Sequence, residues 1–216
     1  MTGSLLQQGL ARHYSGEQLR RLATVRVGIA GAGGLGSNCA MLLARNGVRH
    51  LVIVDFDQVE PSNLNRQCYF AADVGRAKVA ALGRHLHSLD PDLDLSLVEA
   101  RLEPSSLASI FAGCGIVVEA LDSPKAKAML CNHFARPDSG VFLACASGLG
   151  GFGGPPMGMR RLGPNMVCVG DFVTEADNHN PPLGPRVMQA AAMQADAVLG
   201  HILSDSGAAK KAGGIP

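Results

Sequence analysis

Short apolar runs alternate with segments of helical spacing along most of the chain. The apolar runs are five or six residues long and are bounded by polar or glycine positions, which is typical of buried strands. These runs lie at 25–30, 50–54, 116–120 and 141–146, and an alternating segment at 93–98 predicts a further strand. Apolar positions at helical spacing predict helices at 5–22 (with a break near Ser15-Gly16), 35–45, 76–89, 105–112, 125–134 and 186–203.

Strands that alternate with helices imply a mainly parallel sheet covered on both faces, so the fold class is α/β. We expect one domain over 1–216, with an N-terminal helical arm over 1–24 and a flexible tail over 204–216. Apolar segments at 157–162 and 166–169 predict a hairpin around Gly163-Pro164, an antiparallel extension of the sheet at its C-terminal end. Polar segments at 56–75 and 171–185 predict long loops, which are often functional when they are ordered.

Composition excludes several classes of protein. Of the 216 residues 47% are hydrophobic and 17% charged, which excludes intrinsic disorder of the whole chain. Nineteen basic and eighteen acidic residues give a net charge of +1, which argues against a nucleic-acid partner. The N-terminus lacks the apolar core of a signal peptide. The uncharged run at 139–159 contains many glycines and a Pro-Pro pair, so it predicts a strand entering a glycine-rich loop and no membrane span.

The six cysteines are spaced too widely for a zinc ribbon or a thioredoxin-type motif, because no Cys-x-x-Cys occurs. Cys39, Cys114 and Cys145 lie in apolar segments, which favours reduced thiols in a cytoplasmic protein. We therefore expect no zinc site.

A glycine-rich loop between a predicted strand and a predicted helix provides the first candidate chemistry. Gly31-Ala-Gly33-Gly34-Leu35-Gly36 fits the pattern that brings backbone amides to a phosphate at a helix N-terminus. Asp55 ends the next predicted strand, where a carboxylate accepts hydrogen bonds from both ribose hydroxyls. The fold is therefore expected to be Rossmann-like, and a nicotinamide dehydrogenase fits the pattern equally well at this point.

The residues that follow favour a nucleoside triphosphate over NAD. Arginine and lysine neutralise phosphate oxygens, and a carboxylate holds magnesium. The segment after Asp55 supplies Asp57, Asn63, Arg66 and Gln67, and Lys78 and Asp122 follow it. An NAD site has no evident use for the extra Arg66, Lys78 and Asp122.

With these motifs the chain resembles the ThiF/MoeB/HesA branch of the ubiquitin-activating superfamily, and most of all the short ThiF-like proteins of thiamine biosynthesis. The resemblance covers the chain from about Arg12 to Leu203, with dense motifs between Gly28 and Asp122. It implies that the C-terminal glycine carboxylate of a ubiquitin-like sulfur carrier attacks the α-phosphate of ATP in the presence of Mg²⁺. Pyrophosphate then leaves and an acyl-adenylate remains, so the expected activity is that of an adenylyltransferase.

The resemblance also implies roles for individual residues. Asn63, Arg66 and Lys78 match the family's phosphate-binding positions, Asp55 its ribose acid and Asp122 its magnesium ligand. Gln67 is expected to support the phosphate site. Arg12 is the best match for an arginine that enters the ATP site of a partner subunit, with Arg20 and Arg21 as alternatives. The resemblance therefore implies a homodimer.

The expected partner is a ThiS-like sulfur carrier, bound through its Gly-Gly tail beside the glycine loop at 148–158. Relatives that transfer sulfur have a cysteine in the loop corresponding to 171–185, and this chain has none there. Cys145 and Cys168 are more typical of small buried hydrophobes. Three alternatives stay open: another acceptor (a molybdopterin-synthase carrier, a peptide or a tRNA), an NAD-dependent oxidoreductase, and a non-catalytic carrier-binding scaffold.

Overall fold

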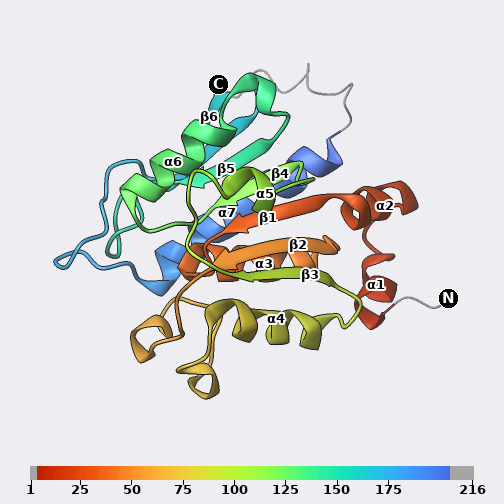
Figure 1. The fold of residues 1–216 in the computed structure, drawn as a ribbon, viewed down its shortest axis with the longest axis horizontal. Helices are drawn as coiled ribbons and strands as arrows, with labels where there is room; N and C mark the ends of the chain where they lie inside the picture. Colours follow the sequence, from red (N-terminus) through yellow and green to blue (C-terminus); the bar gives the residue numbers. More distant parts are fainter. Residues whose placement is uncertain (1–3, 205–216) are drawn as a thin grey trace.

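A computed structural model describes residues 4–204. Seven strands form one sheet in the order β3-β2-β1-β4-β5-β7-β6 (Figure 1). All neighbours pair in parallel except β6 and β7, which are antiparallel. The strands are β1 (Arg26–Ala30), β2 (His50–Asp55), β3 (Asp94–Glu99), β4 (Ile116–Glu119), β5 (Phe142–Ala146), β6 (Gly158–Gly163) and β7 (Met166–Gly170).

Helices cover both faces of this sheet, as expected for a Rossmann-like α/β fold. The helices are α1 (Leu5–Leu10), α2 (Gly16–Thr24), α3 (Gly34–Arg45), α4 (Lys78–Leu89), α5 (Leu107–Ile110), α6 (Pro124–Phe134) and α7 (Gly184–Leu203). Alternate residues of the inner strands face opposite sides: Leu51 and Ile53 pack with α3, α4 and α7, whereas Val52 and Val54 pack with α5 and α6. The predicted antiparallel hairpin is confirmed as β6 and β7.

The predicted break near Ser15-Gly16 in the N-terminal helical segment is confirmed: the chain forms two helices, and α2 begins at Gly16. Ser15 starts a new helix: its hydroxyl accepts from the backbone of Gln18, and the Gln18 side chain accepts from the backbone N–H of Ser15. This reciprocal capping box satisfies amide donors at the start of α2. The predicted tail at 204–216 lies outside the described residues from 205 onward.

The long loop between β2 and α4 contains two short 3-10 turns, η1 (Pro61–Asn63) and η2 (Ala71–Asp73). The segment between β7 and α7 is a loop as predicted, apart from isolated bridges that Pro182 forms with Gly150 and Gly151. Within residues 4–204, no helix is long and apolar enough to cross a lipid bilayer.

Candidate functional site

The predicted site residues, except Arg12, follow the carboxyl ends of neighbouring parallel strands. The glycine loop follows β1, Asp55 ends β2, and Asp122 lies between β4 and α6. In open α/β sheets this edge is where ligands bind. The topology therefore places together residues that are up to about ninety positions apart in the sequence, as Gly31 and Asp122 are.

The first glycine turn is required by close backbone approach. Gly31 has φ +99°, and a Cβ added there would lie 2.6 Å from the carbonyl oxygen of Ala120 on the loop after β4. A Cβ at Gly36 would overlap the carbonyl oxygen of Gly31. Glycine at both positions lets α3 begin directly against the sheet. Leu35 is buried in the core, so only its backbone faces the loop.

Asp55 holds the start of the glycine loop. Its Oδ2 accepts from the backbone N–H of Ala32 at 2.6 Å, and its Oδ1 accepts from the backbone N–H of Asp57 at 2.8 Å. Each carboxylate oxygen retains a further acceptor site. The carboxylate is thus oriented beside the loop and can still accept hydrogen bonds from hydroxyl groups.

Lys78 is the first residue of α4, an unfavourable place for a cation because the helix N-terminus is itself positive. Its side chain is only 8% exposed, and its Nζ donates to Oδ2 of Asp57 at 2.8 Å. Asp57 is 44% exposed and compensates this charge from the solvent side. The local cost of such a cation indicates that it serves a purpose other than stability.

The loop that carries Asn63, Arg66 and Gln67 is fastened to the first turns of α3. The side-chain amide of Asn38 donates to the carbonyls of Gly34 and Arg66 at 2.7 and 2.9 Å. Ser37 links the same two segments, since its hydroxyl donates to Gly33 and accepts from the backbone N–H of Cys68. These contacts bring Arg66 and Gln67 to the glycine loop.

The three side chains on this loop are held in different ways. Asn63 is buried, and its Oδ1 accepts from the backbone N–H of Glu60 at 3.1 Å. Arg66 donates to the carbonyl of Ser62 and to Oδ1 of Asn65, both at 2.9 Å, and its stem lies 3.5 Å from a Cβ built at Gly34. Gln67 is buried, and its Oε1 has no hydrogen-bond partner among residues 4–204.

Asp122 is exposed and forms no ion pair with any residue in the described range. Within 4–204, no group of three or more Cys, His, Asp or Glu side chains is arranged to hold a metal ion. A cation at Asp122 would therefore need oxygen ligands from a bound molecule or water.

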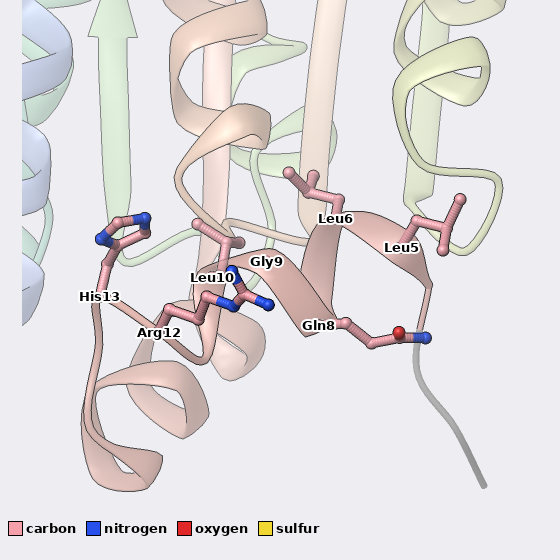
Figure 2. Close-up of a pocket in the computed structure, with 7 residues that line it drawn as sticks. All are labelled: Leu5, Leu6, Gln8, Gly9, Leu10, Arg12 and His13. Atoms are coloured by element: carbon pink, nitrogen blue, oxygen red, sulfur yellow. The ribbon is translucent and has the colours of Figure 1, made fainter.

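Arg12 lies away from all of these residues. It follows α1, and the nearby Tyr14 hydroxyl donates to Asn46 at 2.9 Å, at the C-terminal end of α3. The twelve-residue helix α3 is roughly 18 Å long, so Arg12 lies at the opposite edge of the sheet from the glycine loop. Figure 2 shows it exposed among the residues that line an open cavity of about 590 Å³ beside α1.

Sequence reasoning missed five buried polar residues near this edge. Tyr69 donates to the carbonyl of Ala32 at 2.8 Å, which ties the long loop to the glycine loop. Glu119, at the end of β4, is 1% exposed and pairs with Lys127 of α6 at 2.7 Å. Asp171 and Arg186 form a second buried pair, and Gln194 bridges β4 and β5 through two backbone carbonyls.

Burial shifts the pKa of Glu119 and of two buried cysteines. It raises the pKa of Glu119, against the lowering effect of Lys127. Burial likewise raises the pKa of Cys39 to about 12 and raises that of Cys168. Cys145 faces Cys131, with 3.8 Å between their sulfur atoms. Cys145 and Cys168 are both buried, as predicted for small hydrophobes.

The model of the ThiF family matches residues 6–212. The chain belongs to the ThiF family. It is 42% identical over 104 residues to the SAMP-activating enzyme E1 of Haloferax volcanii, a match that covers 48% of this chain and 38% of that protein. It is 31% identical over 156 residues to the adenylyltransferase and sulfurtransferase UBA4 of Yarrowia lipolytica, covering 72% of this chain and 39% of that protein. The chain thus spans about two-fifths of the length of these two ThiF relatives.

The fold is shared with solved structures. The crystal structure of Escherichia coli tRNA N6-threonylcarbamoyladenosine dehydratase in complex with AMP superimposes with a TM-score of 0.81. The match covers 90% of this chain and 93% of that chain at 22% sequence identity. This agreement confirms the Rossmann-like ThiF fold.

Proposed function

We propose that this chain is an adenylyltransferase that activates the C-terminal glycine carboxylate of a ubiquitin-like sulfur carrier with ATP. The carrier we propose is ThiS-like, and the pathway is formation of the thiazole of thiamine in the cytoplasm. Support comes from the ThiF family, from the adenylyltransferase among its relatives and from the geometry of the sheet edge.

One observation carries this proposal: three long helices begin at the same edge without a capping side chain. The residues before α3, α4 and α7 are Gly33, Ala77 and Leu183, and none of them caps the helix through its side chain. None of these helices has an acidic residue in its first turn. The aligned peptide dipoles of these helices make such an edge attractive to anions. The buried Lys78 adds a full positive charge.

The side chains around this edge divide the work on ATP. Asp55 would accept the ribose hydroxyls, since its carboxylate is fixed beside the glycine loop with acceptor sites left over. Asn63, Arg66 and Lys78 would bind the phosphates, with Gln67 supporting them. A carboxylate that attacks a phosphate is already ionised at neutral pH, so the reaction needs charge neutralisation and positioning more than a general base.

Magnesium fits the donor chemistry of Asp122. An exposed carboxylate without an ion-pair partner in the described chain is the hard oxygen donor that Mg²⁺ prefers, usually together with phosphates and water. Bound there, the ion would neutralise phosphate charge. Asp57 is less suited, because its Oδ2 is engaged with Lys78.

A homodimer gives Arg12 a role that it lacks within its own chain. Because it lies at the opposite edge of the sheet from the glycine loop, it can reach a nucleotide only in a second copy. We propose that Arg12 does so, and that the active species is therefore a dimer.

A second acceptor class is favoured by one comparison. The dehydratase that shares the fold acts, by its name, on a modified tRNA, and the match covers nearly the full length of both chains. A tRNA carrying a threonylcarbamoyl group would offer a carboxylate to the same ATP site. The net charge of +1 favours the protein carrier over the nucleic acid.

ATP–pyrophosphate exchange tests the proposal. Purified protein with Mg²⁺ is assayed with a ThiS-type carrier, with the same carrier lacking its last glycine, and with threonylcarbamoylated tRNA. Exchange that needs the terminal glycine supports the carrier reading, and exchange with the tRNA alone replaces it. Protection against heating by NADH and not by MgATP would overturn adenylation in favour of an NAD-dependent enzyme.

A further inference from the structure

A buried ion pair lies between the two loops at the C-terminal half of the sheet edge. Asp171 directly follows β7, and Arg186 is the third residue of α7. Their side chains are 0% and 8% exposed, and Nη2 of Arg186 donates to Oδ2 of Asp171. Neither residue contacts the groups that we assign to ATP, so the pair calls for a separate explanation.

Asp171 organises the loop at 171–183. Its Oδ1 accepts from the backbone N–H groups of Val173 and Thr174, both at 2.8 Å. Its Oδ2 accepts from the Thr174 hydroxyl as well as from Arg186. Burial raises the pKa of Asp171, but the hydrogen bonds from Thr174 and Val173 and the charge of Arg186 outweigh it, and the pKa is lowered. The carboxylate is thus ionised and saturated with donors.

Arg186 faces the other loop, the glycine-rich segment at 147–157. Its Nη1 donates to the carbonyl of Pro155 at 3.3 Å. A Cβ built at Gly154 would lie 3.1–3.3 Å from the guanidinium, so the plane of Arg186 rests against bare backbone there. The two loops also pair directly: the N–H of Gly150 donates to Thr174 and that of Gly151 to Pro181.

The first turn of α7 touches the nucleotide side as well. A Cβ at Gly34 of the glycine loop would lie 2.7 Å from Cγ1 of Val187, and one at Gly184 would lie 2.6 Å from the carbonyl oxygen of Asn65. Residues 184–187 are therefore packed between the proposed phosphate site and the two C-terminal loops. Any movement of these loops relative to the proposed phosphate site would therefore also displace residues 184–187.

Each of the two loops carries one exposed, large apolar side chain. Phe152 is 85% exposed and Val173 is 74% exposed. Both side chains are accessible to a polypeptide that lies along these loops. In Figure 1 the loop before α7 projects beyond the carboxyl ends of the strands.

We propose that the Asp171–Arg186 pair positions the loops at 147–157 and 171–183 against the glycine loop at 31–36 (the nucleotide loop). The pair thereby holds the C-terminal segment of a polypeptide acceptor in line with ATP. The inference rests on the proposed function, and it deepens that function by naming the residues that place the acceptor. Arg186 is a positioning residue: it acts through the loop backbone and does not touch the reacting atoms. The pairing also keeps Asp171 from presenting an uncompensated negative charge to an incoming carboxylate.

The test separates the acceptor from ATP. Arg186→Met, Arg186→Lys and Asp171→Asn are compared with wild type in ATP–pyrophosphate exchange with the ThiS-type carrier, and ATP binding is measured separately. We expect the KM for the carrier to rise at least tenfold in Arg186→Met, with the Kd for ATP changed less than twofold. Arg186→Lys should recover part of the loss. Arg136→Met, an exposed arginine on the segment after α6, is the matched control.

Each outcome bears on the inference. A parallel rise in the carrier KM and the ATP Kd would mean that the pair only maintains the fold, and an unchanged carrier KM in a folded Arg186→Met would also overturn the inference. If Arg186→Met does not fold, Gly154→Ala presses on the guanidinium from the loop side without a strained φ, and the same selective rise in KM is expected. If wild type shows no exchange with any polypeptide acceptor, the proposed function fails first and this inference falls with it.

Discussion

Replacing Lys78 with Met should separate the stability of the fold from its chemistry. Lys78 is the first residue of α4, where a positive charge opposes the helix dipole at a cost of about 0.3–1 kcal/mol. The ion pair with Asp57, which is 44% exposed, returns about 0.2–1 kcal/mol. These effects nearly cancel, and the apolar stem of Met fills the same buried channel. We therefore expect the free energy of unfolding of Lys78→Met to lie within about 1 kcal/mol of wild type.

The effect on adenylation should be much larger. A donor aimed at developing charge in a transition state contributes roughly a hundred- to a thousandfold to the rate. We expect Lys78→Met to lower ATP–pyrophosphate exchange by that factor, and Lys78→Arg to retain more activity because it keeps the charge. Urea unfolding of both variants supplies the stability comparison. The reasoning is refuted if Lys78→Met loses more than about 2 kcal/mol of stability while exchange stays within threefold of wild type.

Three further predictions follow from the buried charges and thiols. Lys127→Met should lower the free energy of unfolding by about 3 kcal/mol at pH 8, because it leaves the Glu119 carboxylate buried and unpaired. The loss should shrink toward pH 5, because the raised pKa of Glu119 lets its carboxyl protonate in the folded state; urea unfolding at both pH values measures this, and a pH-independent loss contradicts it. Iodoacetamide at pH 8 should label Cys131, whose pKa is lowered by the Cys145 thiol, much faster than Cys39, whose pKa is about 12. Peptide mass spectrometry measures the two labelling rates, and equal rates would be inconsistent with the burial of Cys39. Burial raises the pKa of Asp73, but hydrogen bonds from the Phe70 backbone and His85 outweigh this effect and the pKa is lowered, so the carboxylate stabilises the fold above about pH 4 and this contribution is lost as pH falls through the lowered pKa. Asp73→Asn should therefore reduce the dependence of the free energy of unfolding on pH in the acid range, and an unchanged slope argues against the reasoning.

The nucleotide half of the edge could be predicted from sequence because its residues follow strand ends. Gly31 follows β1 and Asp55 ends β2, and parallel strands bring such positions to one edge whatever the intervening loops do. Lys78 could be placed there through the family motif. Its position at the start of an uncapped helix, which makes the charge informative, appears only in the structure.

The glycine loop proposed to lie beside the acceptor could be located from the sequence, but the buried Asp171–Arg186 pair could not, because its contacts join loops that have no periodic signal. Asp171 and Arg186 are fifteen residues apart in the sequence. One begins a predicted loop and the other begins the predicted helix that follows it, and nothing in the sequence pattern pairs them. Glu119 lies in an apolar strand, and its burial is explained by the ion pair with Lys127 on the following helix, which only the structure shows. The interrupted apolar stripe predicts the break near Ser15-Gly16, whereas the reciprocal capping box at Ser15 that restarts the helix is visible only in the structure.

The order of the chain explains how one sheet edge can serve two substrates. β1, α3, β2 and the start of α4 supply the proposed ATP site, and β5, β7 and their following loops supply the proposed acceptor surface. The two halves are joined where α7 packs along α3, and at the edge Val187 lies against Gly34. A glycine at that point lets the first turn of α7 lie directly on the nucleotide loop. Substitutions in the proposed acceptor loops should therefore leave ATP binding unchanged, provided that this turn keeps its place. Arg186, one residue before Val187, is the side chain through which the turn holds them.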